Sequence, residues 1–69
     1  LGQRELAIAA FQGVLQLNEE FPDVHFHLAR ALDDCHRPLE AMEHWRRFME
    51  LAPNSPWVAE AQDRLSGNP

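Results

Sequence analysis

The sequence of 69 residues contains no lysine and only one cysteine, Cys35. A single cysteine excludes a disulfide within the chain, which fits a reducing compartment, and we expect a cytoplasmic protein. Acidic side chains outnumber basic ones by 11 to 6, so the formal net charge is −5. Because nucleic-acid recognition needs a basic surface, we expect no nucleic-acid contact by this segment.

Long apolar runs are also missing. No stretch approaches the roughly 20 residues that a transmembrane helix needs, and no secretory signal is recognisable at the start. We therefore expect no membrane contact. The chain begins with Leu1 rather than methionine, so we expect that its natural start lies upstream and that a longer parent protein carries any targeting signal.

Alternation of apolar and polar residues with period two, typical of a half-buried strand, does not occur, so the sequence predicts an all-α fold. The apolar residues follow helical spacing in four segments instead. We expect helices at Gln3–Glu19, Asp23–Cys35, Pro38–Leu51 and Pro56–Leu65, followed by a terminator over residues 66–69.

Prolines and capping residues separate these segments. Pro38 and Pro56 suit the first turn of a helix, where a backbone N–H is not needed. We expect Asp23 to cap the N-terminus of the second helix and Ser55 to cap the fourth.

The second half of the chain repeats the first half at a shift of 34 residues. The helix expected at Gln3–Glu19 recurs as the helix expected at Pro38–Leu51, and the positions that face the core are apolar in both. The superimposed pairs are Ala7 and Ala41, Ile8 and Met42, Phe11 and Trp45, Val14 and Phe48, Leu15 and Met49, Leu17 and Leu51, Pro22 and Pro56, Val24 and Val58, and Arg30 and Arg64. Thirty-four residues is the period of the tetratricopeptide repeat.

Residues 22–55 resemble one complete tetratricopeptide repeat. The matching positions are the aliphatic and small pair Leu28 and Ala29, the apolar Leu32, the small Ala41, the aromatic Trp45 and the closing Pro53. Phe48 departs from the pattern, because the family usually has alanine there. The resemblance implies a fragment of a right-handed α-solenoid built from antiparallel helix pairs.

The flanking segments resemble parts of neighbouring repeats within a single domain, residues 1–69. Residues 1–21 are similar to the second helix of a preceding repeat, with Glu19 in place of the closing proline. Residues 56–66 are similar to the first helix of a following repeat, but Gln62 and Asp63 replace its aliphatic and small pair. Polar residues there suit a capping helix with nothing packed beyond it.

The residues that could bind a metal or act in catalysis each have a structural explanation. His25 and His27 lie two residues apart on a helix and point in different directions, and no spacing of histidine and cysteine matches a zinc site. Ser55 and Ser66 lie at helix ends, where capping explains them. The adjacent acids at residues 33–34 read as a solvated helix end. We expect no metal, no cofactor and no enzymatic activity.

The family resemblance implies a protein–protein interaction module, a scaffold or adaptor that binds a peptide or partner segment in a concave groove. In such arrays the first helices of successive repeats line that groove. The groove residues expected here are Phe26, Arg30, Asp33, Glu60 and Arg64. Phe26 has a second interpretation, in which it packs on a neighbouring helix. Trp57 likewise either packs on the preceding helix or contacts a partner.

Family members that bind chaperone tails use lysines and asparagines to hold a C-terminal carboxylate. Phe26 and Arg30 stand at the matching places here, and the chain has no lysine. We therefore expect a mixed-charge or hydrophobic peptide rather than a chaperone tail.

Two alternatives from other classes stay open. One is a regulatory or structural segment of a larger protein, whose groove is filled by its own chain. Residues 44–48 and 55–57 are similar to terminal repeats of bacterial proteins in which such arrays are fused to DNA-binding regulators. The other alternative is an oligomerisation module, because a chain of this length is marginally stable alone. Leu6, Ala10 and Leu17 of the first helix lack a partner helix, so we expect the chain to self-associate.

Overall fold

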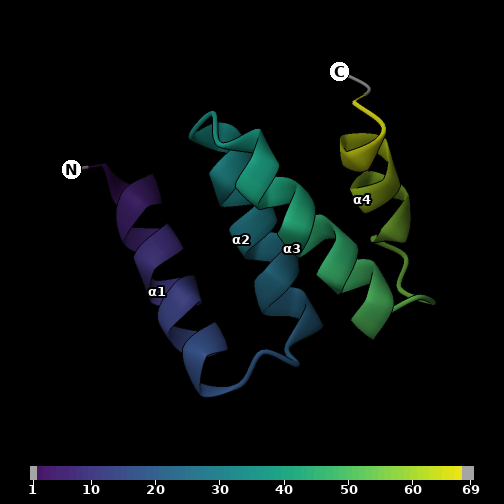
Figure 1. The fold of residues 1–69 in the computed structure, drawn as a ribbon, viewed down its shortest axis with the longest axis horizontal. Coiled ribbons are helices and arrows are strands. Elements are labelled where there is room, and N and C mark those ends of the chain that lie inside the picture. The colour runs from purple at the N-terminus through teal and green to yellow at the C-terminus, as the bar shows by residue number, and fades with distance from the viewer. Residues whose placement is uncertain (1, 68–69) are drawn as a thin grey trace.

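The computed structural model describes residues 2–67, and within this range the chain forms four helices and no strand (Figure 1). The helices are α1 (Gln3–Leu17), α2 (Pro22–Asp34), α3 (Pro38–Leu51) and α4 (Val58–Leu65). The prediction of an all-α fold with four helices is therefore confirmed. Leu1 and residues 68–69 of the predicted terminator lie outside the described residues.

Helices that follow one another in the sequence pack together and run in alternating directions (Figure 1). α2 contacts α1 and α3, and α3 contacts α2 and α4. The molecule measures 32 × 28 × 17 Å, so its thin dimension holds only about two helix diameters. Each helix consequently keeps one side towards solvent. None of the described helices combines the length and the apolar character that crossing a membrane requires.

The interior is built where α2, α3 and α4 meet. Trp45, Phe48, Leu28 and Leu32 are its largest fully buried side chains. Three alanines, residues 29, 41 and 61, are completely buried beside them, and such small side chains let helices approach closely. α1 contributes less, since Ile8 is its one fully buried residue.

The N-terminus of α2 differs from the prediction. The helix begins at Pro22, its N-cap is Phe21, and no side chain caps it, so the assignment of Asp23 as the N-cap is wrong. The fixed backbone angle of Pro22 suits the first helical position, and this places Asp23 inside the first turn. There its negative charge still interacts favourably with the helix dipole.

α4 begins two residues later than expected. Ser55 Oγ accepts a hydrogen bond from the backbone N–H of Trp57 at 3.1 Å, and the Ser55 carbonyl accepts one from Val58 at 3.1 Å. Ser55 therefore organises a turn around Pro56, and the helix starts only after that turn, at Val58.

The connection between α2 and α3 is closed by His36, whose φ of 60° lies in the left-handed region. The N–H of His36 donates to the Asp33 carbonyl at 3.0 Å, and the N–H of Arg37 donates to the Leu32 carbonyl at 2.9 Å. These bonds satisfy the last carbonyls of α2 and let Pro38 start the next helix directly.

Candidate functional site

Four of the five expected groove residues lie together between α2 and α4. Arg64 donates from Nη1 to Asp33 Oδ2 at 3.2 Å and from Nη2 to Glu60 Oε2 at 3.5 Å. Arg30 Nε lies 3.8 Å from the same oxygen of Glu60. The charges alternate along this ion-pair chain, which we define as Arg30, Glu60, Arg64 and Asp33. Two helices that are distant in sequence are thereby joined at their surface.

Phe26, the fifth expected residue, is buried, with 3% of its surface exposed. Its ring centroid lies 5.2 Å from those of Trp45 and Phe48 and 4.6 Å from that of Trp57. Of its two interpretations, packing on neighbouring elements is therefore the correct one, and Phe26 does not line an open groove. The helical spacing of apolar residues assigned too few positions of α2 to the core. Both α3 and the residues before α4 cover the side of α2 that carries Phe26.

Asp33 contacts a buried side chain as well as the ion-pair chain at the surface. The indole N–H of Trp45 donates to Asp33 Oδ2 at 3.0 Å, and Trp45 itself is completely buried. A buried indole N–H needs an acceptor, and this carboxylate provides it. The sequence carried no signal for this contact, which depends on how α2 and α3 are rotated against each other.

A row of aromatic side chains, Phe11, His27 and Trp57, lies beside the ion-pair chain. The Phe11 and His27 rings stack at 6.0 Å, and His27 meets Trp57 at 5.9 Å. Trp57 also packs on Phe26, yet 40% of its surface stays exposed. Trp57 thus contacts α2 while a large part of its side chain remains exposed. The Arg30 guanidinium lies 5.8 Å from the ring centroid of Phe26. Because Phe26 also packs on Trp57, it connects the aromatic row to the ion-pair chain.

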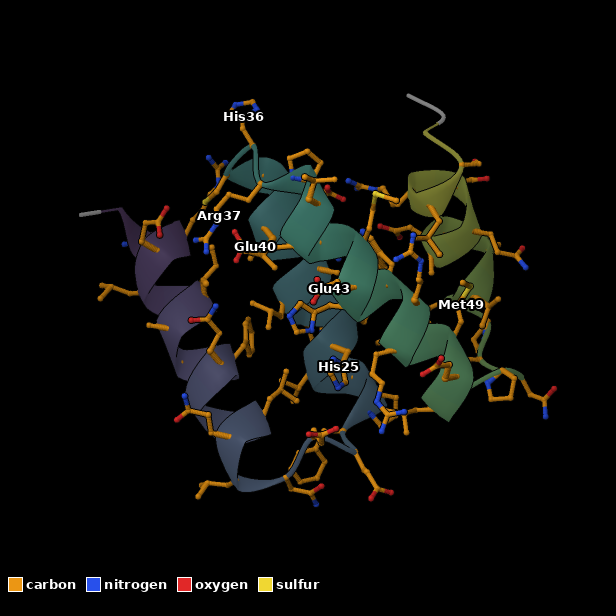
Figure 2. The ribbon with its side chains drawn as sticks, in the orientation of Figure 1. His25, His36, Arg37, Glu40, Glu43 and Met49 are labelled. Carbon is orange, nitrogen blue, oxygen red and sulfur yellow. The ribbon has the colours of Figure 1, made fainter. Side chains whose placement is uncertain are left out.

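A hollow of about 720 Å³ lies between α1 and α3. Its walls carry Gln12 and Gln16 from α1 and Glu43 and Arg47 from α3, and its other lining residues are Leu15, Glu19, His25, Leu28 and His44. Figure 2 shows His25 and Glu43 in this part of the molecule. The spacing of His25 and His27 along one helix gave no sign that His25 contacts His44, which lies on a different helix.

His25 and His44 meet end to end in this hollow. Their Nδ1 atoms are 2.9 Å apart, and the His25 Nε2 atom lies 2.7 Å from the Glu19 carbonyl oxygen. Their ring centroids are 5.2 Å apart, about the largest separation that this contact between the two nitrogens permits. The two Nδ1 atoms therefore point at each other, not at a common third point where a metal ion could sit.

Burial lowers the pKa of the His44 imidazole, and the neighbouring His25 lowers it further. Glu43 and Glu40 act in the opposite direction. Glu40 is held by Arg37 in a bidentate pair, with N···O distances of 2.9 and 2.7 Å, close to the α2–α3 turn (Figure 2). The Arg37 hydrogen bond keeps the pKa of the Glu40 carboxyl below its ordinary value.

Cys35 offers no activated nucleophile. Partial burial raises the pKa of its thiol, and the nearby Glu5 raises it further. The thiol is therefore protonated at neutral pH, and the thiolate is the reactive form. Among residues 2–67, no group of three or more histidine, cysteine, aspartate or glutamate side chains is placed to hold a metal ion.

Comparison with known proteins adds no relative. A scan against protein-family models finds no matching family, and searches of curated proteins and of solved structures find no match. The resemblance to the tetratricopeptide repeat depends on the residues and the period of the sequence itself.

Proposed function

We propose that the chain is a protein–protein interaction module made of tetratricopeptide-like helix pairs, and that it binds a peptide segment of a partner protein. The proposed binding face consists of the ion-pair chain and the aromatic row. The observation that carries the proposal is the convergence of Arg30, Glu60 and Arg64 on one face. Phe26 connects this face to the half-exposed Trp57, because it contacts both Arg30 and Trp57. This face acts by binding, and the proposal includes no catalytic step.

The internal repeat supports the choice of this face. Arg30 and Arg64 are superimposed by the shift of 34 residues, and both contact Glu60. In tetratricopeptide arrays the first helices of successive repeats line the binding groove. α2 and α4 correspond to such first helices, and they carry the two arginines on one face.

The chemistry of the face indicates a partner segment with both charges and an apolar side chain. Arg30 and Glu60 have side-chain exposures of 53% and 40%, and the 3.8 Å between them leaves hydrogen-bonding capacity unused. Trp57, which packs on the same Phe26 ring that Arg30 contacts, adds an exposed aromatic surface. A peptide with one aromatic or aliphatic residue flanked by an acid and a base would fit all three groups.

The test is selection from a library of random peptides displayed on phage, followed by affinity measurement on the enriched peptides. Arg30→Glu should weaken their binding by about tenfold or more, equivalent to roughly 1.4 kcal/mol. Arg46→Glu is the matched control, because Arg46 is exposed on α3 and undergoes the same charge change. Failure to enrich any peptide, or equal losses in the two variants, would contradict the proposal.

Self-association is a second candidate function, favoured by the outer face of α1. Leu6 and Leu17 are 60% and 91% exposed. Helical spacing places Ala10 and Gly13 between them, and this face carries no charge. A second copy in the reverse direction would set Leu6 against Leu17, with the small residues at the centre. The face is one short helix, so the dimer would be weak, below the roughly 800 Å² per partner of a standard interface.

A further inference from the structure

The hydrogen bonds of His25 define which nitrogens carry protons. A backbone carbonyl oxygen can only accept, so His25 Nε2 must donate its proton to the Glu19 carbonyl. In the neutral pair, His25 Nδ1 is then an acceptor, and His44 Nδ1–H is the donor. The Nε2 atom of His44 carries no proton in this arrangement.

The contact withstands one proton but not two. A first proton on His44 Nε2 leaves one hydrogen between the two Nδ1 atoms, so the hydrogen bond persists and is strengthened by the charge. A second proton would require a hydrogen on each Nδ1. Two N–H groups and two positive charges would then face each other across 2.9 Å, where His25 is only 4% exposed.

We propose that His25 and His44 form a pH-sensitive clamp, which holds the segment after α1 against α2 and α3 while the pair carries at most one proton and releases it when both rings are protonated. Three elements meet in the clamp: the Glu19 carbonyl from the α1–α2 connection, His25 from α2 and His44 from α3. The clamp goes beyond the proposed binding function and does not depend on it.

The charges around the pair are few and mixed. Glu43 and Glu40 on α3 favour a proton on His44, although Glu40 is held by Arg37. Arg47 lines the same hollow and lies 3.8 Å from the exposed Glu19 carboxylate. α1 faces the pair with Gln12 and Gln16, which do not titrate. These groups can accommodate the first proton, whereas the second must also overcome the charge of the first.

α1 is the element that the clamp would release. It buries only Ile8 completely, whereas α2 buries five residues and α3 three. An element with few buried contacts opens at a lower free energy than the rest of the fold. Loss of the clamp should therefore show first in the amides of α1.

The clamp is tested by NMR on the 15N-labelled chain. Two-bond 1H–15N spectra at neutral pH should show a proton on His25 Nε2 and on His44 Nδ1. Amide-exchange protection of α1, relative to α2 and α3, should then fall by about tenfold or more between pH 7 and pH 5. The upper limit is about tenfold per pH unit for each proton that the pair takes up when α1 opens.

Three variants separate the clamp from general acid effects. His44→Asn keeps an N–H donor near the Nδ1 position but does not titrate, so α1 should stay protected at both pH values. His44→Leu removes the donor, so α1 should be poorly protected at both. His36→Asn is the control, because His36 lies at the α2–α3 turn away from the pair and asparagine tolerates its left-handed backbone; it should behave as the unchanged chain.

Two results would overturn the clamp. The first is a neutral-pH spectrum with the proton on the other nitrogen of either ring, and this measurement needs no variant. The second is a loss of α1 protection in His44→Asn equal to that of the unchanged chain.

Discussion

At the scale of single residues, Asp33 connects the interior of the molecule to its proposed binding face. Its Oδ2 atom accepts from the buried indole of Trp45 and from the guanidinium of Arg64. The sequence predicted Asp33 as a surface residue, whereas only 20% of its side chain is exposed. Asp33 therefore contributes to stability as well as to the charge of the face.

Replacing Asp33 by alanine should destabilise the fold by about 1–3 kcal/mol, because the buried indole N–H of Trp45 would lose its acceptor. Urea unfolding measures the change. Asp34→Ala is the matched control, since Asp34 is exposed on the same turn and its loss should stay within about 0.5 kcal/mol. Equal effects of the two substitutions would show that the indole bond does not matter.

His44 should make stability depend on pH. Its pKa is lowered in the folded state, so below the ordinary histidine value of about 6.5 the unfolded chain binds more protons. Stability is then fully present above that value and is lost as the pH falls through the folded pKa. Because one imidazole takes up at most one proton on unfolding, the slope that His44 contributes should stay below about 1.4 kcal/mol per pH unit.

Urea midpoints measured between pH 7.5 and pH 5 test this dependence, in a range above the titration of most carboxyl groups. The midpoint should fall towards pH 5 in the unchanged chain and fall less in His44→Asn. Identical slopes in the two proteins would assign the dependence to other groups.

At the scale of helices, α1 contains a glycine that lowers its helix propensity and that can be replaced. Gly13 lies in its middle, and a Cβ added there would meet no atom within 4 Å. Gly13→Ala should therefore stabilise the fold by about 0.5–1 kcal/mol, through helix propensity alone. Thermal unfolding followed by circular dichroism should show a midpoint several degrees higher, at roughly 4–8 °C per kcal/mol.

Gly67 provides the opposite case for comparison. Its φ of 77° is a left-handed conformation that a side chain disfavours, although open space surrounds it. Gly67→Ala should not stabilise the protein. A gain equal to that of Gly13→Ala would mean that the backbone conformation is not what separates the two sites.

The helices themselves were largely predictable from the sequence. Proline at the start and apolar spacing along its length gave the bounds of α3, Pro38–Leu51, as observed. The start of α4 was missed because the Ser55 hydroxyl can cap a helix or close a turn, and the sequence does not distinguish the two.

The candidate face was predictable only in part. Helical spacing and the 34-residue period brought Arg30, Asp33, Glu60 and Arg64 to one side, where the structure joins them. The burial of Phe26 depends on how α2 is rotated against its neighbours. Periodicity along one helix does not specify that rotation, and for the same reason it could not reveal that His25 meets His44 across two helices.

At the scale of the whole molecule, the two ends differ in character. The outer face of α1 exposes Leu6 and Leu17, whereas α4 exposes the polar Gln62 and Asp63. A second copy could therefore cover the apolar end of the first, and the polar end would stay in water.

Sedimentation equilibrium should show concentration-dependent self-association, and Leu17→Glu should abolish it by placing a charge in the contact. Leu39→Glu is the matched control, because Leu39 is 78% exposed but lies on α3; its self-association should be unchanged. A folded monomer at high concentration, or equal effects of the two substitutions, would count against the α1 contact.

We propose that the chain binds a peptide on the face shared by α2 and α4. The most direct measurement is titration of the 15N-labelled chain with a peptide enriched from the random library, followed residue by residue in 1H–15N spectra. The proposal predicts that the largest shifts fall on Arg30, Trp57, Glu60 and Arg64. Shifts confined to the hollow between α1 and α3, or no saturable shifts at all, would contradict it.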